Sequence, residues 1–549
     1  MSLRSPLVYQ IPEETVRVAQ AAFPKGTLYL TMQAELGMIY TNDQFASLFS
    51  ATGQPALDPA RLALILVFQF LEGLSDRQAA EAVRSRIDWK YALALELTDP
   101  GFDASALSEF RQRLSAGAME EHLLTTLLTQ RTDRGLVKAR GTQRTDSTHI
   151  LAAVRSLNRL ELLIETVRHA LNRLAAVAPT WLRTRIHPDW ADRYSHRAEN
   201  FRLPTAETAR QALASQVGAD GFALLTTIDD PTIPAPVRDE PAVIILRRIW
   251  WQQFYGPSDS PQLRPTNDAP PSAQMIKSPY DDEARYSIKR ETTWTGSKLH
   301  VTETCDPAMP RLVIDVQTTP ATIQDDTMLP IIQMSLQRRD MLPTTHLVDA
   351  GYTNVQNLCT SRQYHAITIL GPVAADPSWQ ARSRQGFDHS QFVIDWDRQV
   401  GTCPEGKHSL KWRAFHDERP NALYNVQFSR ADCTPCPSRA ACTQAESAAR
   451  QLTVGSREWY TITQEARTRQ QTPEFKAAYA RRAGVESLIS QSIRVCQIRR
   501  SRYIGRTRTH LQHLLMAVAI NLLRLAAWWH APIPTSRPQP PFTQLVATG

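Results

Sequence analysis

Three acidic side chains occupy positions from which they could hold divalent metal ions. Asp146 lies in a strand-like run, Asp349 ends another short apolar run, and Glu486 lies in a predicted helix beside several arginines. Hydrolysis of a phosphodiester needs a nucleophilic water and a stabilised leaving oxygen, and two ions roughly 3.5–4 Å apart can supply both. Mg²⁺ prefers carboxylate and water oxygens. Acids supplied by strand ends and a helix are therefore the side chains that this chemistry requires.

Composition alone does not select these three acids, because the chain contains 54 aspartates and glutamates. An aspartate at the end of a strand is most often a turn or cap residue. The competing acids near predicted strands and turns are Asp306, Asp315, Asp325, Asp326, Asp395 and Asp397.

A resemblance to a known family favours the first three. The run Tyr-Ala-Arg-Arg-Ala-Gly-Val-Glu, from Tyr479 to Glu486, resembles the Tyr-x2-Arg-x3-Glu signature of DDE transposases from bacterial insertion sequences. Thr145-Asp146-Ser147-Thr148 is similar to the first-acid strand of that family, and Leu347-Val348-Asp349-Ala350-Gly351-Tyr352 is similar to the second. The order also fits, with a predicted hairpin between the two acid strands.

Weaker likenesses extend the resemblance over most of residues 25–529. The run Asp281–Arg285 ahead of Thr295–Lys298 is similar to the approach to the second strand in these transposases. The other matching segments are Leu74–Ala79 and Ser108–Leu114 near the N-terminus, and a closing helix with His513, Ala519, Asn521, Leu522 and Arg524.

The resemblance implies an α/β fold with an RNase H-like catalytic core, and a mechanism. Asp146, Asp349 and Glu486 would ligate two Mg²⁺ (or Mn²⁺) ions. A metal-bound water would attack a phosphate at the transposon end, and the freed 3′-hydroxyl would then attack target DNA. Arg482 and Tyr479 lie four and seven residues before Glu486, near one helical face with it, and would position phosphate and neutralise charge.

One departure from the family pattern affects the expected activity. The family has a lysine seven positions after the glutamate, where this chain has Ile493 followed by Arg494. Either Arg494 reaches the same phosphate from the neighbouring position, or this copy has lost a DNA contact and is less active.

The segment around Glu486 is strongly basic and is predicted to bind DNA. Arginine suits bidentate phosphate contacts, and such contacts supply most of the non-specific affinity for DNA. A charge run is usually a solvated face, but here its sign and its closeness to Glu486 favour DNA. Besides Arg482, the predicted DNA-contacting residues are Arg481, Arg494, Arg499, Arg500, Arg502, Arg506, Arg508 and Lys298.

Four cysteines form a separate cluster that could bind a structural Zn²⁺ ion. Cys433-Thr-Pro-Cys436 has the spacing of a zinc knuckle, and Cys403 and Cys442 could complete a tetrahedral site. The spacing from Cys436 to Cys442 is looser than in a standard pair. The alternatives are four free thiols in a small subdomain, or a site in which His408 or His416 replaces one thiol.

The elements that must position these residues begin with helices over residues 25–135. Asp58 and Pro59 favour a helix start, and Ser75 with Gln78 resembles a capping box. Short helices with tight connections and scattered arginines fit a helix-turn-helix-like DNA-binding unit. The alternative is a plain helical bundle with a solvated basic face.

Strands alternate with helices in the rest of the chain, which we divide into further units. We expect strands at 145–150, 297–304, 311–318, 346–348 and 365–370, and helices over 322–339 and 473–529. A helical insertion follows the first strand, and a cysteine-containing insertion precedes the last helices. The expected units are 1–135 (helical, DNA-binding), 136–155 (first catalytic strand), 156–280 (helical insertion, ending in a surface linker at 256–279), 281–375 (core), 376–470 (cysteine insertion), 471–530 (catalytic and basic helices) and 531–549 (disordered tail).

Composition limits the class of protein. The 549 residues carry 62 basic and 54 acidic side chains, a net charge of +8, and the seven cysteines form no disulfide framework. No secretory signal is evident, and the apolar stretch 511–529 is interrupted by Arg524, which favours a buried helix over a membrane span. We expect a cytoplasmic, nucleoid-associated protein that acts on terminal repeats and target DNA as a homodimer. The alternatives are a decayed DNA-binding copy and a metal-dependent nuclease that does not join strands.

Overall fold

The computed structural model describes residues 2–3, 9–50, 52–258, 260–289, 291–383, 386–415 and 423–530. The predicted tail at 531–549 and the alternative zinc ligand His416 lie outside the described residues.

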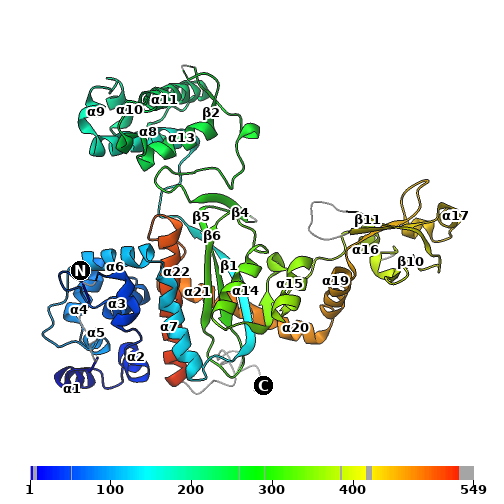
Figure 1. The fold of residues 1–549 in the computed structure, drawn as a ribbon, viewed down its shortest axis with the longest axis horizontal. Helices are drawn as coiled ribbons and strands as arrows, with labels where there is room; N and C mark the ends of the chain where they lie inside the picture. The colour runs from blue at the N-terminus through cyan, green and yellow to red at the C-terminus, as the bar shows by residue number, and fades with distance from the viewer. Residues whose placement is uncertain are drawn as a thin grey trace, which may run out of the picture.

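A mixed six-stranded sheet lies at the centre of the chain (Figure 1). The strand order is β4-β5-β1-β7-β8, and β6 also pairs with β5. β1 runs antiparallel to β5 and parallel to β7, and β7 runs parallel to β8. The predicted mixed α/β class is therefore confirmed. The strands are β1 (Arg140–Leu151), β4 (Arg285–Lys289), β5 (Thr292–Thr304), β6 (Val313–Pro320), β7 (Pro343–Val348) and β8 (Thr368–Leu370).

Several predicted boundaries in the core were wrong. The expected strands at 145–150 and 297–304 begin five residues earlier, at Arg140 and Thr292. The expected strand at 365–370 begins only at Thr368, because His365 ends helix α15 (Val355–His365) and Ala366 takes a left-handed conformation. The expected helix at 322–339 is α14 (Met328–Arg338). The helix begins six residues later than expected because Asp325, in the preceding turn, accepts hydrogen bonds from Lys298 and Ser147.

Helices cover the N-terminal part of the chain, as predicted. Asp58 and Ser75 cap α3 and α4 through their side chains, and Ser75 forms the predicted capping box with Gln78. All of these helices except the first share one continuous hydrophobic cluster with the central sheet, so no core boundary separates them. They are α1 (Glu13–Ala22), α2 (Leu28–Leu36), α3 (Pro59–Glu72), α4 (Asp76–Ser85), α5 (Ile87–Ala92), α6 (Ser105–Ala116) and α7 (Glu120–Asp133), with the 3₁₀ helix η1 (Asn42–Leu48).

The last helix, α22 (Arg506–His530), joins the N-terminal helices to the sheet. Buried Asn521 exchanges hydrogen bonds with the backbone N–H and carbonyl of Val313 on β6. The helix is long and apolar enough to cross a membrane, but 78% of its most apolar window is buried inside the molecule. The prediction of a buried core helix is therefore confirmed. The predicted helix over 473–529 is interrupted, however: residues 497–505, between α21 (Gly484–Cys496) and α22, are not helical.

The helical insertion after β1 forms a separate lobe with its own hydrophobic cluster (Figure 1). Met275 and Ile276 are buried in it, which corrects the prediction that 256–279 is only a surface linker. Ile276 is fixed there because its N–H donates to Gln252. The elements are α8 (Arg159–Val177), α9 (Pro179–Arg183), α10 (Trp190–Tyr194), η2 (Asn200–Arg202), α11 (Glu207–Ile228), α12 (Ala235–Arg238), α13 (Pro241–Gln253), β2 (Phe254–Tyr255), β3 (Gln262–Leu263) and η3 (Thr266–Asp268).

The cysteine-containing segment forms another small lobe around Phe392, Val426, Phe428, Leu452 and Val454. Its elements are α16 (Trp379–Ser383), η5 (His389–Gln391), β9 (Val393–Asp395), β10 (Val400–Thr402), β11 (Ser409–Phe415), β12 (Leu423–Phe428), α17 (Arg430–Cys433), α18 (Arg439–Cys442) and β13 (Gln451–Val454), followed by α19 (Arg457–Arg469).

Candidate active site

The sheet brings the first two predicted acids to neighbouring positions. β1 and β7 are parallel, and their register pairs Thr145 with Val348, so the next residues, Asp146 and Asp349, are side by side where β7 ends. Asp146 is buried in the strand, with 11% of its side chain exposed, whereas Asp349 is 40% exposed. Each carboxylate accepts a hydrogen bond from the backbone N–H of the following residue.

The third acid is supplied by helices that follow the cysteine lobe. α20 (Pro473–Ala480) leads into the 3₁₀ turn η6 (Arg481–Ala483) and then into α21 (Gly484–Cys496). α20 rests on the sheet through Phe475, whose ring stacks on Tyr479 at 5.5 Å between centroids. Glu486 projects from the first turn of α21 with 66% of its side chain exposed.

The three carboxylates converge on one guanidinium. Arg482 Nη2 lies 2.6 Å from Asp146 Oδ2 and 3.7 Å from Asp349 Oδ2, and Arg482 Nη1 lies 3.1 Å from Glu486 Oε1. The four residues predicted from sequence to act together are therefore brought together, although 336 positions separate Asp146 from Arg482.

Burial and charge oppose each other in this cluster. Burial raises the pKa of the Asp146 carboxyl, and Arg482 offsets only part of that effect. Burial also disfavours the charged form of Arg482, yet the carboxylates of Asp146 and Asp349 raise the pKa of its guanidinium above the ordinary value. Burial raises the pKa of the Tyr479 hydroxyl, which stays neutral and able to donate a hydrogen bond.

A second polar cluster lies beside the acids and was not predicted as a unit. Asp325 accepts hydrogen bonds from Lys298 Nζ at 3.0 Å and from Ser147 Oγ at 3.0 Å, and Ser147 is next to Asp146. Burial would raise the pKa of the Asp325 carboxyl, but Lys298 holds it below the ordinary value. His300 and Tyr352 are hydrogen-bonded beneath at 2.7 Å. No local sequence pattern could have joined residues from four separate elements.

Comparison with known proteins assigns the family. A family model described as "Transposase DDE domain" matches residues 402–526, and one described as "Transposase domain (DUF772)" matches residues 17–113. The chain belongs to the DDE transposases of insertion-sequence type. No curated protein and no solved structure matches it. The first match includes Glu486 and the four clustered cysteines, whereas Asp146 and Asp349 lie outside both matches.

The basic residues of the transposase divide into two groups. Arg499, Arg502 and Arg506 are engaged within the chain: Arg499 with Thr148 and the carbonyl of His149, Arg502 with the Phe70 ring and the carbonyl of Leu74, and Arg506 with Glu283. Lys298 is held inward by Asp325 and the carbonyl of Ile323.

The second group is free of internal partners. The side chains of Arg494, Arg500 and Arg508 are exposed, and no residue in the described part of the chain forms a hydrogen bond or ion pair with them. Arg481 belongs to neither group: it is half-buried, and its backbone carbonyl accepts a hydrogen bond from Arg144. Ile493, at the position of the family's lysine, packs against the main hydrophobic cluster, so Arg494 carries the nearest positive charge along this helix.

The four clustered cysteines of the transposase line one cavity of about 30 Å³ with Phe387, Phe428 and Arg450. All four are free thiols. Burial raises the pKa of the Cys442 thiol, and the other three sulfurs raise it further. Among the described residues, however, no group of three or more His, Cys, Asp or Glu is arranged to hold a metal ion. The geometry therefore does not support the zinc prediction.

Within the described part of the chain, the three acids do not form such a metal-holding group either, and their carboxylates lie around Arg482. Their chemistry nevertheless suits a hard cation, since all three donors are carboxylates and already surround a positive charge.

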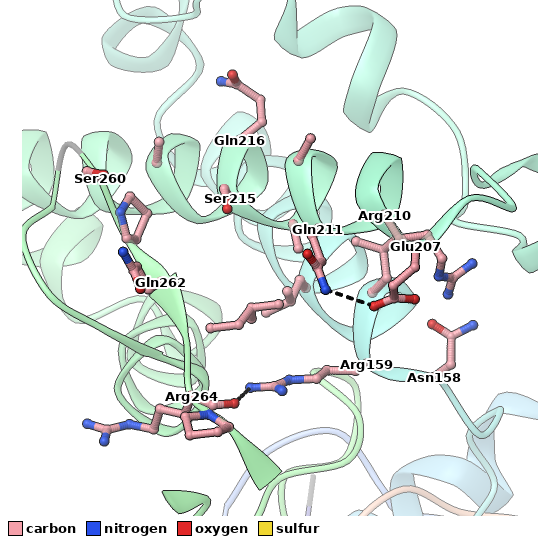
Figure 2. A pocket seen from close by; sticks show the side chains of 18 residues that line it. Asn158, Arg159, Glu207, Arg210, Gln211, Ser215, Gln216, Ser260, Gln262 and Arg264 are labelled. Atoms are coloured by element: carbon pink, nitrogen blue, oxygen red, sulfur yellow. Dashed lines mark hydrogen bonds between the residues drawn. The ribbon is translucent and has the colours of Figure 1, made fainter.

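The two largest hollows in the described part of the transposase are not lined by the three acids. One of about 780 Å³ lies inside the helical insertion, between α8, α11 and β3 (Figure 2). Its arginines are engaged, since Arg159 donates to the carbonyl of Arg264 and Arg210 donates to that of Pro204. Another, of about 800 Å³, lies beside the site between residues 353–356 and α19. Of the three acids, Asp349 and Glu486 are exposed to solvent, with 40% and 66% of their side chains accessible, whereas Asp146 is 11% exposed.

Proposed function

We propose that this transposase cuts DNA at the ends of its mobile element and joins the freed 3′ ends to target DNA, with Asp146, Asp349 and Glu486 as the metal ligands. The convergence of these three carboxylates on Arg482 carries the proposal, because it joins a buried strand, a strand end and a helix at one open position. When bound there, two divalent ions supply an activated water and stabilise the leaving oxygen.

The topology supports an RNase H-like core. Three parallel strands, β1, β7 and β8, are extended on the β1 side by the antiparallel strands β5 and β6. This arrangement has the strand order expected from the resemblance, with the first acid on the central strand and the second at the end of its parallel neighbour. The helical lobe enters between β1 and β4, and the cysteine lobe between β8 and α20.

The chain's own residues divide the work as follows. Asp146 is the buried, fixed ligand, and Asp349 and Glu486 are exposed ligands at the rim. Arg482 lies within reach of all three, and can bind a phosphate oxygen through the N–H groups of Nη1 and Nη2 that are not donated to carboxylates. Tyr479 keeps its proton and can donate a hydrogen bond to the same phosphate. Arg494, Arg500 and Arg508 extend the positive surface for the DNA backbone.

Two other proposals concern the oligomeric state of the transposase and its location in the cell. Bringing two element ends together requires two active sites, so we propose a homodimer on DNA. The chain would act in the bacterial cytoplasm, where its DNA is located.

One observation favours a second candidate function, a decayed copy that binds DNA without cutting it. Ile493 packs against the main hydrophobic cluster where the family has a lysine, so one expected phosphate contact is missing on α21. A nuclease that does not join strands is the remaining alternative.

A cleavage and joining assay separates these functions. A labelled duplex carrying the element's terminal repeat is incubated with target plasmid in Mg²⁺ or in EDTA, using the wild type, Asp146→Asn, Asp349→Asn and Glu486→Gln. Asp397→Asn is the matched control, because Asp397 is an exposed acid of the cysteine lobe that pairs only with Arg457 among the described residues.

We expect Mg²⁺-dependent nicking at the repeat boundary and joined products for the wild type and the control, and neither product for the three site variants. Tight binding without cleavage in Mg²⁺ or Mn²⁺ would identify the decayed form. Cleavage without joined products would identify a nuclease.

A further inference from the structure

A buried arginine two residues before the first acid lies against the turn that carries Arg482. Arg144 and Asp146 are two apart on β1, so their side chains project from the same face of the sheet. That face is covered by η6 and α21. Asp146 accepts from the side chain of Arg482, and Arg144 Nη1 donates to the backbone carbonyl of Arg481. Side chains of β1 are therefore hydrogen-bonded to two consecutive residues of η6, Arg481 and Arg482.

Arg144 is itself fixed by a buried acid. Glu303 lies directly opposite it on β5, and Arg144 Nε donates to Glu303 Oε1 at 2.7 Å. The side chain of Arg144 is 3% exposed and that of Glu303 is fully buried. The second oxygen of Glu303 pairs with Arg524 of α22, which also donates to Gln491 of α21. Both the strand and the two helices therefore meet at this carboxylate.

Gly484 makes room for the guanidinium. A Cβ atom at this position would lie 2.0 Å from Arg144 Nη1 and 2.4 Å from its Cζ. The backbone of Gly484 has ordinary right-handed helical angles, φ −64° and ψ −19°, so its conformation does not require glycine. Since glycine is a poor helix former, the space for Arg144 is the physical reason for a glycine at the first position of α21.

We propose that Arg144, seated between Glu303 and Gly484, is the positioning residue that sets the distance between Asp146 on β1 and the Arg482–Glu486 pair. This inference rests on the proposed function, since it concerns the geometry of the same three acids. Arg144 does not contact the acids itself. It acts through the start of α21: without its guanidinium, η6 loses one of its two attachments to β1, and Glu486 is free to move away from Asp146.

The test uses the full chain and four variants. Arg144→Met removes the guanidinium but leaves Glu303 paired with Arg524, so the buried carboxylate keeps a cation and the protein is expected to fold. Arg144→Lys keeps the charge with one donor group. Gly484→Ala adds the colliding Cβ. The double variant Arg144→Met/Gly484→Ala adds the same Cβ in a protein that lacks the Arg144 guanidinium. Arg339→Met is the matched control, a buried arginine that pairs with Asp315 and Glu121 away from the acids.

Three quantities are measured: the Tm, the Mn²⁺ affinity from the EPR signal of free Mn²⁺, and hydrogen exchange of a peptide spanning residues 479–490. We expect Arg144→Met and Gly484→Ala to weaken Mn²⁺ binding by about tenfold or more, as loss of a supporting contact does at metal sites. Both should raise exchange in the peptide, and Arg144→Lys should restore part of each loss. Arg339→Met should lower Tm and leave Mn²⁺ affinity unchanged.

The double variant supplies the decisive comparison. If the guanidinium occupies the space that a Cβ at position 484 would need, Gly484→Ala lowers Mn²⁺ affinity much less in the Arg144→Met background than in the wild type. The proposal would be overturned if the two substitutions acted additively, both in lowering Mn²⁺ affinity and in raising hydrogen exchange of the peptide. It would also be overturned by an Arg144→Met protein that is less stable but binds Mn²⁺ and protects the peptide like the wild type, because Arg144 would then be structural only.

Failure of the proposed function is distinguishable. If the wild type and Asp146→Asn bind Mn²⁺ equally, the acids are not metal ligands, and the exchange data alone then decide whether Arg144 holds η6 to β1.

Discussion

At the scale of single residues, Arg482 explains how acids from distant parts of the chain form one site. Its two terminal nitrogens reach Asp146, Asp349 and Glu486, of which only Asp146 is buried. Three carboxylates held this close repel one another, and the guanidinium offsets that repulsion. The same residue type at this position also suits phosphate binding, so one side chain serves both the assembly of the site and its substrate.

Buried histidines make the stability of the transposase depend on pH. Burial lowers the pKa of His300 and His346 to about 4 and that of His513 to about 3, from an ordinary value of 6.5. Below about pH 6.5 these histidines bind protons in the unfolded chain but stay neutral in the folded chain. The free energy of unfolding therefore falls as pH falls from 6.5 toward the pKa values of the folded state.

His513→Gln isolates one of these contributions. Between pH 7.5 and pH 5, we expect the wild type to lose about 2 kcal/mol more of its unfolding free energy than the variant, since each pKa unit corresponds to about 1.4 kcal/mol. Urea unfolding at the two pH values measures the difference. Equal losses in the two proteins would contradict a neutral, buried His513.

At the scale of elements, local sequence patterns predicted some features and missed others. The capping box at Ser75 and the hairpin of β5 and β6 follow from residues close in sequence. So does the alignment of Arg482 with Glu486, which is a one-turn spacing. These features depend on helix and strand periods, which a single sequence displays.

Long-range contacts could not be predicted in this way. Arg144 reaches Glu303 and the carbonyl of Arg481, which are 159 and 337 positions away. Nothing near Arg144 distinguishes it from the other arginines of the chain. Similarly, the run of arginines at 494–508 predicted one DNA-binding surface, whereas Arg502 packs on Phe70 in the N-terminal helices. Composition gives the sign of a segment's charge, but only the fold decides which charges remain free.

This division of the arginines leads to a prediction for DNA binding. Replacing Arg494, Arg500 and Arg508 with glutamine should weaken DNA binding and lower the slope of log K against log salt by about 3, because each phosphate contact contributes about 0.9. Arg502→Met should instead lower Tm with little change in slope. Filter binding across a salt series measures both. An unchanged slope in the triple variant would contradict the assignment.

At the scale of the whole molecule, the central sheet is continuous with the N-terminal helices, whereas the helical insertion is separate. The main hydrophobic cluster contains residues of the N-terminal helices, the sheet, α21 and α22, but none from the insertion, which has its own cluster. The insertion also leaves and re-enters at one place, since Ala152, Asp281 and Ala284 line the same small hollow.

Excision of the insertion should therefore leave a folded remainder. A chain in which a short glycine–serine linker replaces residues 156–280 is expected to unfold cooperatively and to bind Mn²⁺ as the full chain does, because no acid or supporting residue is removed. Circular dichroism and Mn²⁺ titration check this. An aggregated remainder, or one without Mn²⁺ binding, would contradict an independent lobe.

Metal rescue tests most directly whether the three acids form one metal site. Asp146→Cys, Asp349→Cys and Glu486→Cys are assayed for cleavage of the terminal-repeat duplex in Mg²⁺ and in Mn²⁺, with Asp397→Cys as control. A thiolate is a poor ligand for Mg²⁺ and a better one for softer ions. We predict that each site variant is inactive in Mg²⁺ and regains part of its cleavage in Mn²⁺, while the control is active in both. Wild-type cleavage in Mg²⁺ by any of the three site variants would contradict the account.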